Sequence, residues 1–217
     1  MSRGFKMGVL AAAVMATAPA VQAFEAGDFI LRAGVVHVAP DDSSDSINGL
    51  DGNPLLGLNA KVAVDSNSQL GIRGTYMLNN SLGLGVLAAT PFKHNISGSA
   101  DIAGLGTIGE TKHLPPTITL QYYPMASSSA LQPYAGVGVN YTTFFEEKSA
   151  LGDLELDDSV GVAVEFGVDY MLSEQFGLNA AVWWADIDTE AEIKGVTEKF
   201  DVQIDPMVYM VGFTYKF

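Results

Sequence analysis

The chain has 217 residues, of which 48% are hydrophobic and 17% are charged, which suits one folded domain and excludes a disordered chain. Its formal net charge is −14, so electrostatic repulsion disfavours a nucleic acid as a partner. Because cysteine is absent, disulfides, thiolate metal sites and cysteine nucleophiles are excluded as well.

The first residues have the features of an export signal. Arg3 and Lys6 precede an apolar stretch that leads to Val21-Gln22-Ala23, a cleavage site with small residues at its first and third positions. The apolar core is roughly a dozen residues long, whereas a membrane-spanning helix needs about twenty. We therefore predict a signal peptide over residues 1–23 and a mature domain over residues 24–217.

The rest of the chain alternates between two kinds of residue. In Val160–Leu172 every second residue is apolar and mostly large, and most of those between are small or charged. Ala135–Phe145 and the last strand, from Met207 onward, repeat the pattern, which is typical of strands with two different faces. Eight strands are predicted: Phe29–Ala39, Leu70–Leu78, Ser81–Ile96, Lys112–Tyr123, Pro133–Phe145, Val160–Leu172, Phe176–Ile187 and Val202–Phe217.

A soluble β-sandwich would also alternate, with its polar face in water. Long strands, aromatic residues towards strand ends and connections that alternate between short and long favour a membrane barrel instead. Among β-structures, only a closed sheet satisfies every backbone polar group in a bilayer. We therefore predict an all-β protein, an eight-stranded antiparallel transmembrane β-barrel with both termini on the periplasmic side.

The predicted extracellular connections are the long ones. Most of them are rich in acidic residues and are expected to be solvated loops. Spaced carboxylates could hold divalent cations, but the full calcium-loop spacing is absent, so we predict no metal and no cofactor. These loops are Pro40–Gln69, Ser97–Thr111, Glu146–Ser159 and Asp188–Asp201.

The interior of the barrel is predicted from the face opposite the apolar one. Near the periplasmic end this inward set mixes both signs of charge. Because unpaired buried charges are costly, we expect the charges to pair across the lumen and close it. The residues are Arg32, Arg73, Glu165, Asp169 and Lys216.

In the outer half the inward set becomes apolar. A slot with this lining would admit a hydrophobic molecule and exclude hydrated ions, which would lose water without gaining ligands. The same side chains could instead fill a solid core, and the residues alone leave both alternatives open. The predicted lining is Val36, Leu87, Ala89, Phe144, Trp183, Ile187, Val208 and Met210.

Several segments spread over the mature chain together resemble the OmpW family of small outer-membrane porins, which includes alkane-uptake proteins. The resemblance implies an eight-stranded barrel whose apolar channel passes small hydrophobic compounds and can release them sideways into the membrane. It also implies a hydrophobic constriction at Leu87 and Trp183. The segments are Glu25–Phe29, Arg32–Gly34, Leu87–His94, His113–Thr117, Pro133–Gly138, Asn140–Phe145, Trp183–Thr189 and Asp205-Pro206.

Three prolines lie in two neighbouring predicted strands. Pro91, Pro115 and Pro116 each lack the N–H that a β-ladder needs, which fits a weakened wall and a lateral opening. An ordinary sheet edge near a loop would explain them equally well.

The chain ends on Phe217, with Phe213 and Tyr215 at alternate positions before it. This pattern resembles the signal that the barrel-assembly machinery recognises, and it also fits a last strand that faces lipid. Lipid and lipopolysaccharide of the outer membrane are therefore expected partners.

Two other functions are compatible with such a barrel. His94 and His113 could approach each other, but no Ser/His/Asp arrangement accompanies them, so we do not predict an enzyme. A closed barrel that binds a phage or host surface is the other alternative. We predict an outer-membrane pore for passive uptake of small hydrophobic molecules.

Overall fold

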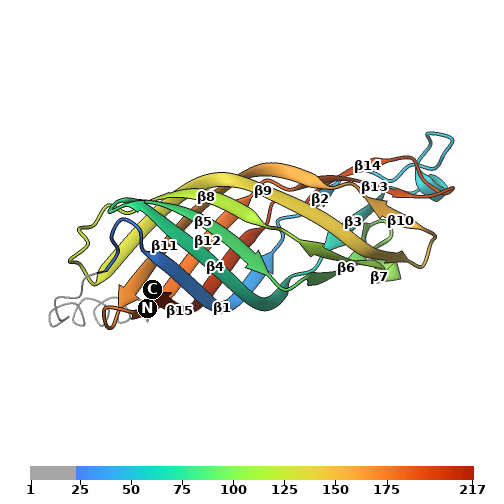
Figure 1. The fold of residues 1–217 in the computed structure, drawn as a ribbon. Coiled ribbons are helices and arrows are strands. Elements are labelled where there is room, and N and C mark those ends of the chain that lie inside the picture. Colours follow the sequence, from blue (N-terminus) through green and yellow to red (C-terminus); the bar gives the residue numbers. More distant parts are fainter. Residues whose placement is uncertain (1–22) are drawn as a thin grey trace, which may run out of the picture.

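The computed structural model describes residues 23–217, so the predicted signal peptide lies outside the described residues except for Ala23. Eight antiparallel strands pair in a ring, and the pairing of the last strand with the first, from Ile30↔Lys216 to Ala39↔Met207, closes it. The predicted barrel is thus confirmed (Figure 1). In ring order the strands are β1 (Phe29–Ala39), β4 (Asn67–Asn79), β5 (Leu82–Ala89), β8 (Thr117–Tyr122), β9 (Leu131–Ser149), β11 (Ser159–Met171), β12 (Phe176–Ala185) and β15 (Met207–Lys216).

The predicted alternation matches the exposure of the side chains. The outward face of the ring carries large apolar residues in every strand, including Val160 at 70% and Val211 at 68% exposure. A continuous exposed apolar surface of this kind marks contact with a membrane. Among residues 23–217, no helix combines the length and the apolar composition needed to cross a bilayer.

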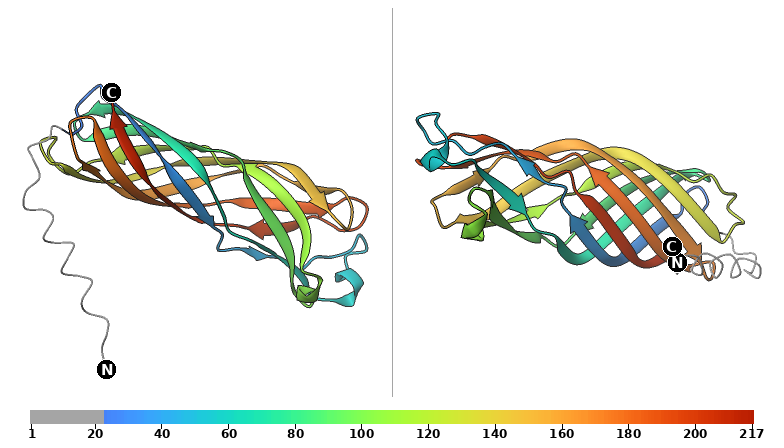
Figure 2. Two further views of the ribbon diagram at one scale, coloured as in Figure 1. Left: turned by 90° about the horizontal axis from the view of Figure 1, so that it is seen from below. Right: turned by 180° about the vertical axis from the view of Figure 1, so that it is seen from behind.

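The strands continue past the ring into an extension, at the end opposite the C-terminus (Figures 1 and 2). One sheet of the extension joins β3, β6 and β7 to the end of β9, and a second has the order β10-β13-β14-β2. The four segments predicted to be long solvated loops contain strands, so the prediction that they are loops is wrong. The elements are β2 (Ser43–Ser44), η2 (Leu55–Gly57), β3 (Ala60–Val64), β6 (Phe92–Ala100), η3 (Ala103–Leu105), β7 (Thr107–Leu114), β10 (Leu154–Leu156), β13 (Asp188–Ile193) and β14 (Phe200–Gln203).

The outer surface of β6 and β7 is charged rather than apolar. Lys93 Nζ lies 2.5 Å from Glu110 Oε2, and Lys112 Nζ lies 2.7 Å from Glu146 Oε2. Because charged side chains are costly in hydrocarbon, this surface places the extension outside the membrane-spanning ring.

Two predicted strands are broken. Ser81–Ile96 divides into β5 and β6, and Lys112–Tyr123 divides into β7 and β8. The ladder between the two strands is interrupted after Leu87↔Thr117 and resumes at Phe92↔His113. Pro91, Pro115 and Pro116 occupy this interval and cannot donate backbone hydrogen bonds.

Two further predicted strands are shorter in the structure. Val202–Phe217 breaks between β14 and β15, where Pro206 lacks a donor, and Phe176–Ile187 ends as β12 at Ala185. Each break marks the passage from the ring into the extension.

Closure of the ring brings two inward glycines together. Gly34 of β1 pairs with Gly212 of β15. A Cβ atom added to Gly34 would lie 2.2 Å from the carbonyl oxygen of Val211, and one added to Gly212 would lie 2.2 Å from that of Ala33. The two strands can therefore approach this closely only because both positions are glycine.

We predict that Gly34→Ala destabilises the barrel by about 1–3 kcal/mol, because the added methyl group forces β1 and β15 apart. Urea unfolding in lipid measures the change. Gly104→Ala is the matched control, since a Cβ there meets nothing within 4 Å. Equal stability of the two variants would contradict the close approach.

Candidate functional site in the barrel interior

A layer of paired charges crosses the ring near its periplasmic end. Arg32 of β1 binds Asp169 of β11 with two nitrogens, Nε to Oδ1 at 2.9 Å and Nη2 to Oδ2 at 2.6 Å. Arg73 of β4 lies 2.6 Å from Glu165 of β11, which is directly opposite in the ring. All four side chains are at most 1% exposed. Each buried charge therefore has an opposite charge as its partner, as low polarity requires.

Aromatic and hydroxyl groups fill the spaces between these pairs. Tyr134 Oη accepts a hydrogen bond from Arg73 at 2.6 Å, and Tyr123 Oη accepts one from Arg32 at 3.0 Å. Thr119 Oγ1 donates to Glu165 at 2.6 Å. The layer is thus held by a connected network and forms a floor across the lumen.

The structure brings together four of the five charged residues expected in this layer. Lys216 lies apart, at the rim of the barrel, although it is on the inward face. Its ammonium group donates to the carbonyl oxygen of Ala23 at 2.6 Å and lies 3.8 Å from Asp28 Oδ2. The prediction that Lys216 belongs to the charged layer is therefore wrong. Alternation predicts which face of the strand a residue is on, but not how far along the barrel axis it lies or which residue it contacts.

A narrow apolar cavity lies on the outer side of this floor. Leu87 of β5 and Trp183 of β12 lie on opposite sides of the ring in its wall, and the indole ring lies 5.2 Å from the Arg73 guanidinium. Met210 is buried in the same apolar cluster as Leu87 and Trp183, but it does not line the cavity. Six of the predicted lining residues line this lower cavity: Val36, Leu87, Ala89, Trp183, Ile187 and Val208.

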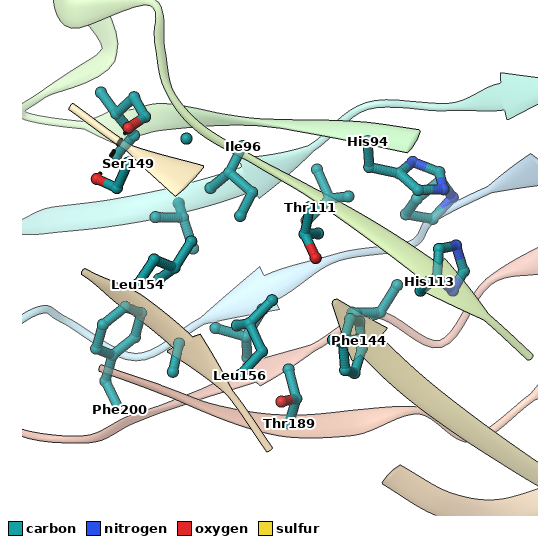
Figure 3. A pocket seen from close by; sticks show the side chains of 18 of the residues that line it. His94, Ile96, Thr111, His113, Phe144, Ser149, Leu154, Leu156, Thr189 and Phe200 are labelled. Atoms are coloured by element: carbon teal, nitrogen blue, oxygen red, sulfur yellow. Dashed lines mark hydrogen bonds between the residues drawn. The ribbon is translucent and has the colours of Figure 1, made fainter. Parts of the chain in front are cut away.

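A second cavity lies in the extension (Figure 3). Of the eight predicted lining residues, only Phe144 lines this upper cavity. Val38 and His113 line both cavities. The interior is therefore apolar from the extension down to the floor. Sequence reasoning missed most of the upper lining, which includes Ile47, Val62, Ile96, Ile108, Leu154, Leu156, Ile193, Phe200, Val202 and Ile204.

A weak signal for these residues is present in the sequence. Leu154 and Leu156 flank one glutamate, and Phe200, Val202 and Ile204 alternate with polar residues. Both patterns are short fragments of the alternation that predicted the ring. The acidic composition around them masked this signal.

The lower cavity reaches the interrupted part of the wall. Ala89, Phe92, His113 and Thr117 line it and come from the four strands on either side of the break. Of the three prolines, Pro115 touches the cavity, while Pro91 and Pro116 are exposed on the outside.

Two histidines lie in the upper cavity, on β6 and β7. The ring centroids of His94 and His113 are 4.8 Å apart, and the residues are only 3% and 4% exposed. Burial lowers the pKa of His113 to about 3, and the neighbouring His94 adds to this effect. Burial also lowers the pKa of His94, although the carbonyl and carboxylate of Asp65 oppose the change. Both imidazoles are therefore neutral at neutral pH.

The terminal aromatics face outward. Phe213, Tyr215 and Phe217 are 57%, 38% and 65% exposed. This position suits contact with lipid, and their role as an assembly signal stays a prediction.

A closed antiparallel barrel with an apolar outer belt defines an integral outer-membrane β-barrel protein. The chain belongs to the OmpW family, whose family model matches residues 25–217. It is 46% identical to outer membrane protein W of Vibrio cholerae, with 97% of each chain covered. The crystal structure of OprG from Pseudomonas aeruginosa superposes with a TM-score of 0.82 at 48% identity, covering 91% of this chain and 99% of that one.

The solution structure of outer membrane protein W from Escherichia coli has a TM-score of 0.60 at 37% identity and covers 89% of this chain and 99% of that one. The predicted family and outer-membrane location are confirmed. The relatives are named as outer membrane proteins, which supports an outer-membrane channel.

The ionic floor leads to a prediction about stability. Arg73→Met leaves Glu165 buried without its partner and should cost about 3–5 kcal/mol, whereas the double variant Arg73→Met/Glu165→Gln should cost much less. Urea unfolding of both variants in lipid measures the difference. An equal cost would show that the two residues act independently.

The buried histidine leads to a prediction about pH. The unfolded chain binds a proton at His113 below pH 6.5, whereas the folded chain does so only near pH 3, so stability should decrease as the pH falls between these values. Thermal unfolding from pH 8 to pH 4 should show this loss, and His113→Phe should reduce it. An NMR titration that shows His113 of the folded protein protonated at pH 6 would contradict this prediction.

Proposed function

We propose that the protein is a passive pore for small hydrophobic molecules, which enter through the extension and leave sideways into the outer membrane. The observation that carries the proposal is the shape of the interior. Two adjoining apolar cavities end on a floor of paired charges, and the lower cavity reaches the interrupted ladder.

The lining supports selection of apolar solutes. An ion that entered the lower cavity would lose its hydration shell between Leu87 and Trp183 and would meet few polar groups in a lining that is mostly apolar. An apolar molecule gains instead, because it leaves water for an apolar surface.

The floor argues against passage straight through the barrel. A solute that crossed it would have to separate the Arg32–Asp169 and Arg73–Glu165 pairs, and would leave four buried charges without partners. The lateral route avoids this cost.

The interrupted ladder supports a lateral exit. Ala88 and Pro116 are exposed on the outer face of the ring, at the level where hydrogen bonding between β5 and β8 stops. Separating the strands there breaks no ladder hydrogen bonds, and an apolar solute would pass from the lower cavity into lipid.

We predict that Gram-negative cells with the protein take up octane faster than cells without it. Leu87→Asp should reduce this uptake several-fold, because a hydrated carboxylate would occupy the slot. Leu50→Asp is the control, since Leu50 is 62% exposed and outside both cavities. Equal uptake with and without the protein would favour the closed barrel that binds a phage or host surface.

The proposed lateral exit is tested separately by linking β5 and β8 covalently where their ladder is interrupted. The natural chain has no cysteine, so the double variant Ala88→Cys/Pro116→Cys can form one disulfide across the break. Octane uptake should decrease on oxidation and return on reduction. Leu84→Cys/Leu120→Cys is the control, because these residues pair across an intact part of the same ladder. Unchanged uptake in the oxidised Ala88/Pro116 variant, with the disulfide verified, would exclude this exit.

A further inference from the structure

The upper cavity contains three buried nitrogen atoms that have no hydrogen-bond partner in the protein. They are Nε2 of His94 and both ring nitrogens of His113. The remaining neighbours of these rings are mostly apolar, with Phe92 and Phe144 packed at 5.5 Å and 5.9 Å from His113. Figure 3 shows the two imidazoles close together on one side of the cavity.

The contacts of His94 define its tautomer. Its Nδ1 contacts the carbonyl oxygen of Asp65, which can only accept, so Nδ1 carries the hydrogen. Nε2 of the neutral ring is then a lone-pair acceptor. His113, also neutral, offers one N–H donor and one acceptor in either tautomer. The pair therefore presents both donor and acceptor groups to whatever occupies the cavity.

The other polar side chains of this cavity already have partners. The hydroxyl groups of Thr111, Ser149 and Thr189 donate to the backbone carbonyls of Lys112, Ile108 and Asp157. The unpartnered polar groups are thus concentrated at the histidine pair, in a cavity that is otherwise apolar.

We propose that His94 and His113 bind the hydroxyl group of an otherwise apolar solute, such as an aliphatic alcohol or an alkylphenol. This inference rests on the proposed uptake function and narrows its substrate class. A hydroxyl group both donates and accepts, so it can donate to Nε2 of His94 while it accepts from the N–H of His113. The apolar part of the solute then lies against the aliphatic lining.

Related solutes fit the pair less well. A hydrocarbon makes no hydrogen bond, and a ketone can only accept, so each leaves buried nitrogens unpaired. A carboxylate accepts but cannot donate, and it carries a charge into an apolar cavity. The expected order of preference is alcohol, then ketone, then hydrocarbon.

The test compares uptake of 1-octanol, 2-octanone and octane by cells, after subtraction of uptake by cells without the protein. His113→Phe keeps an aromatic ring but removes both nitrogens. It should lower the ratio of 1-octanol to octane uptake on the order of tenfold. This is the change in binding expected from the loss of one hydrogen bond of ordinary strength. His37→Phe is the control, because His37 is on the outer face of β1.

The outcomes separate this inference from the proposed function. Uptake of octane without preference for 1-octanol, or an equal loss of both solutes in His113→Phe, would overturn the inference and leave the pore intact. No uptake of octane above background would overturn the pore itself.

A nitrogen-15 NMR spectrum of the wild-type protein in nanodiscs provides a second test. The His94 and His113 ring signals should shift with 1-octanol and not with octane, and unchanged signals with 1-octanol would overturn the inference.

Discussion

The whole structure depends on the closure of β1 onto β15, which separates two environments for alternate residues. The register from Ile30↔Lys216 to Ala39↔Met207 places Arg32 inside and Val35 outside. A slip of one residue would exchange the two faces and place charges in hydrocarbon. Closure also satisfies the backbone groups that an open edge would leave unpaired. The apolar belt and the polar floor are therefore two results of one constraint.

Because the lumen is confined, its charged residues have one another as partners. The pairs of Arg32 with Asp169 and of Arg73 with Glu165 join opposite walls and close the periplasmic end. Beyond this floor the lining is apolar as far as the extension. An apolar solute in the lower cavity therefore meets the charged floor on the periplasmic side and the interrupted ladder between β5 and β8 in the wall. The proposed lateral path follows from this arrangement.

Long alternating segments such as Val160–Leu172 were sufficient to predict the ring and its inward residues, because each segment has many residues with which to define two faces. The extension was not predicted, since Leu154–Leu156 is too short and too acidic to show its alternation clearly. Its partner strand, Asp188–Ile193, is distant in the chain. The position of Lys216 shows the same limit: its face followed from alternation, but its depth depended on the folded N-terminal segment.

The most direct test of the account is the position of an apolar solute in a crystal of the protein soaked with a bromoalkane. Anomalous scattering from bromine locates the solute without any assumption about its path. The account predicts bromine between Leu87, Trp183 and Phe92, on the outer side of the Arg73 side chain. Bromine on the periplasmic side of the Arg32–Asp169 pair, or none in either cavity, would contradict it.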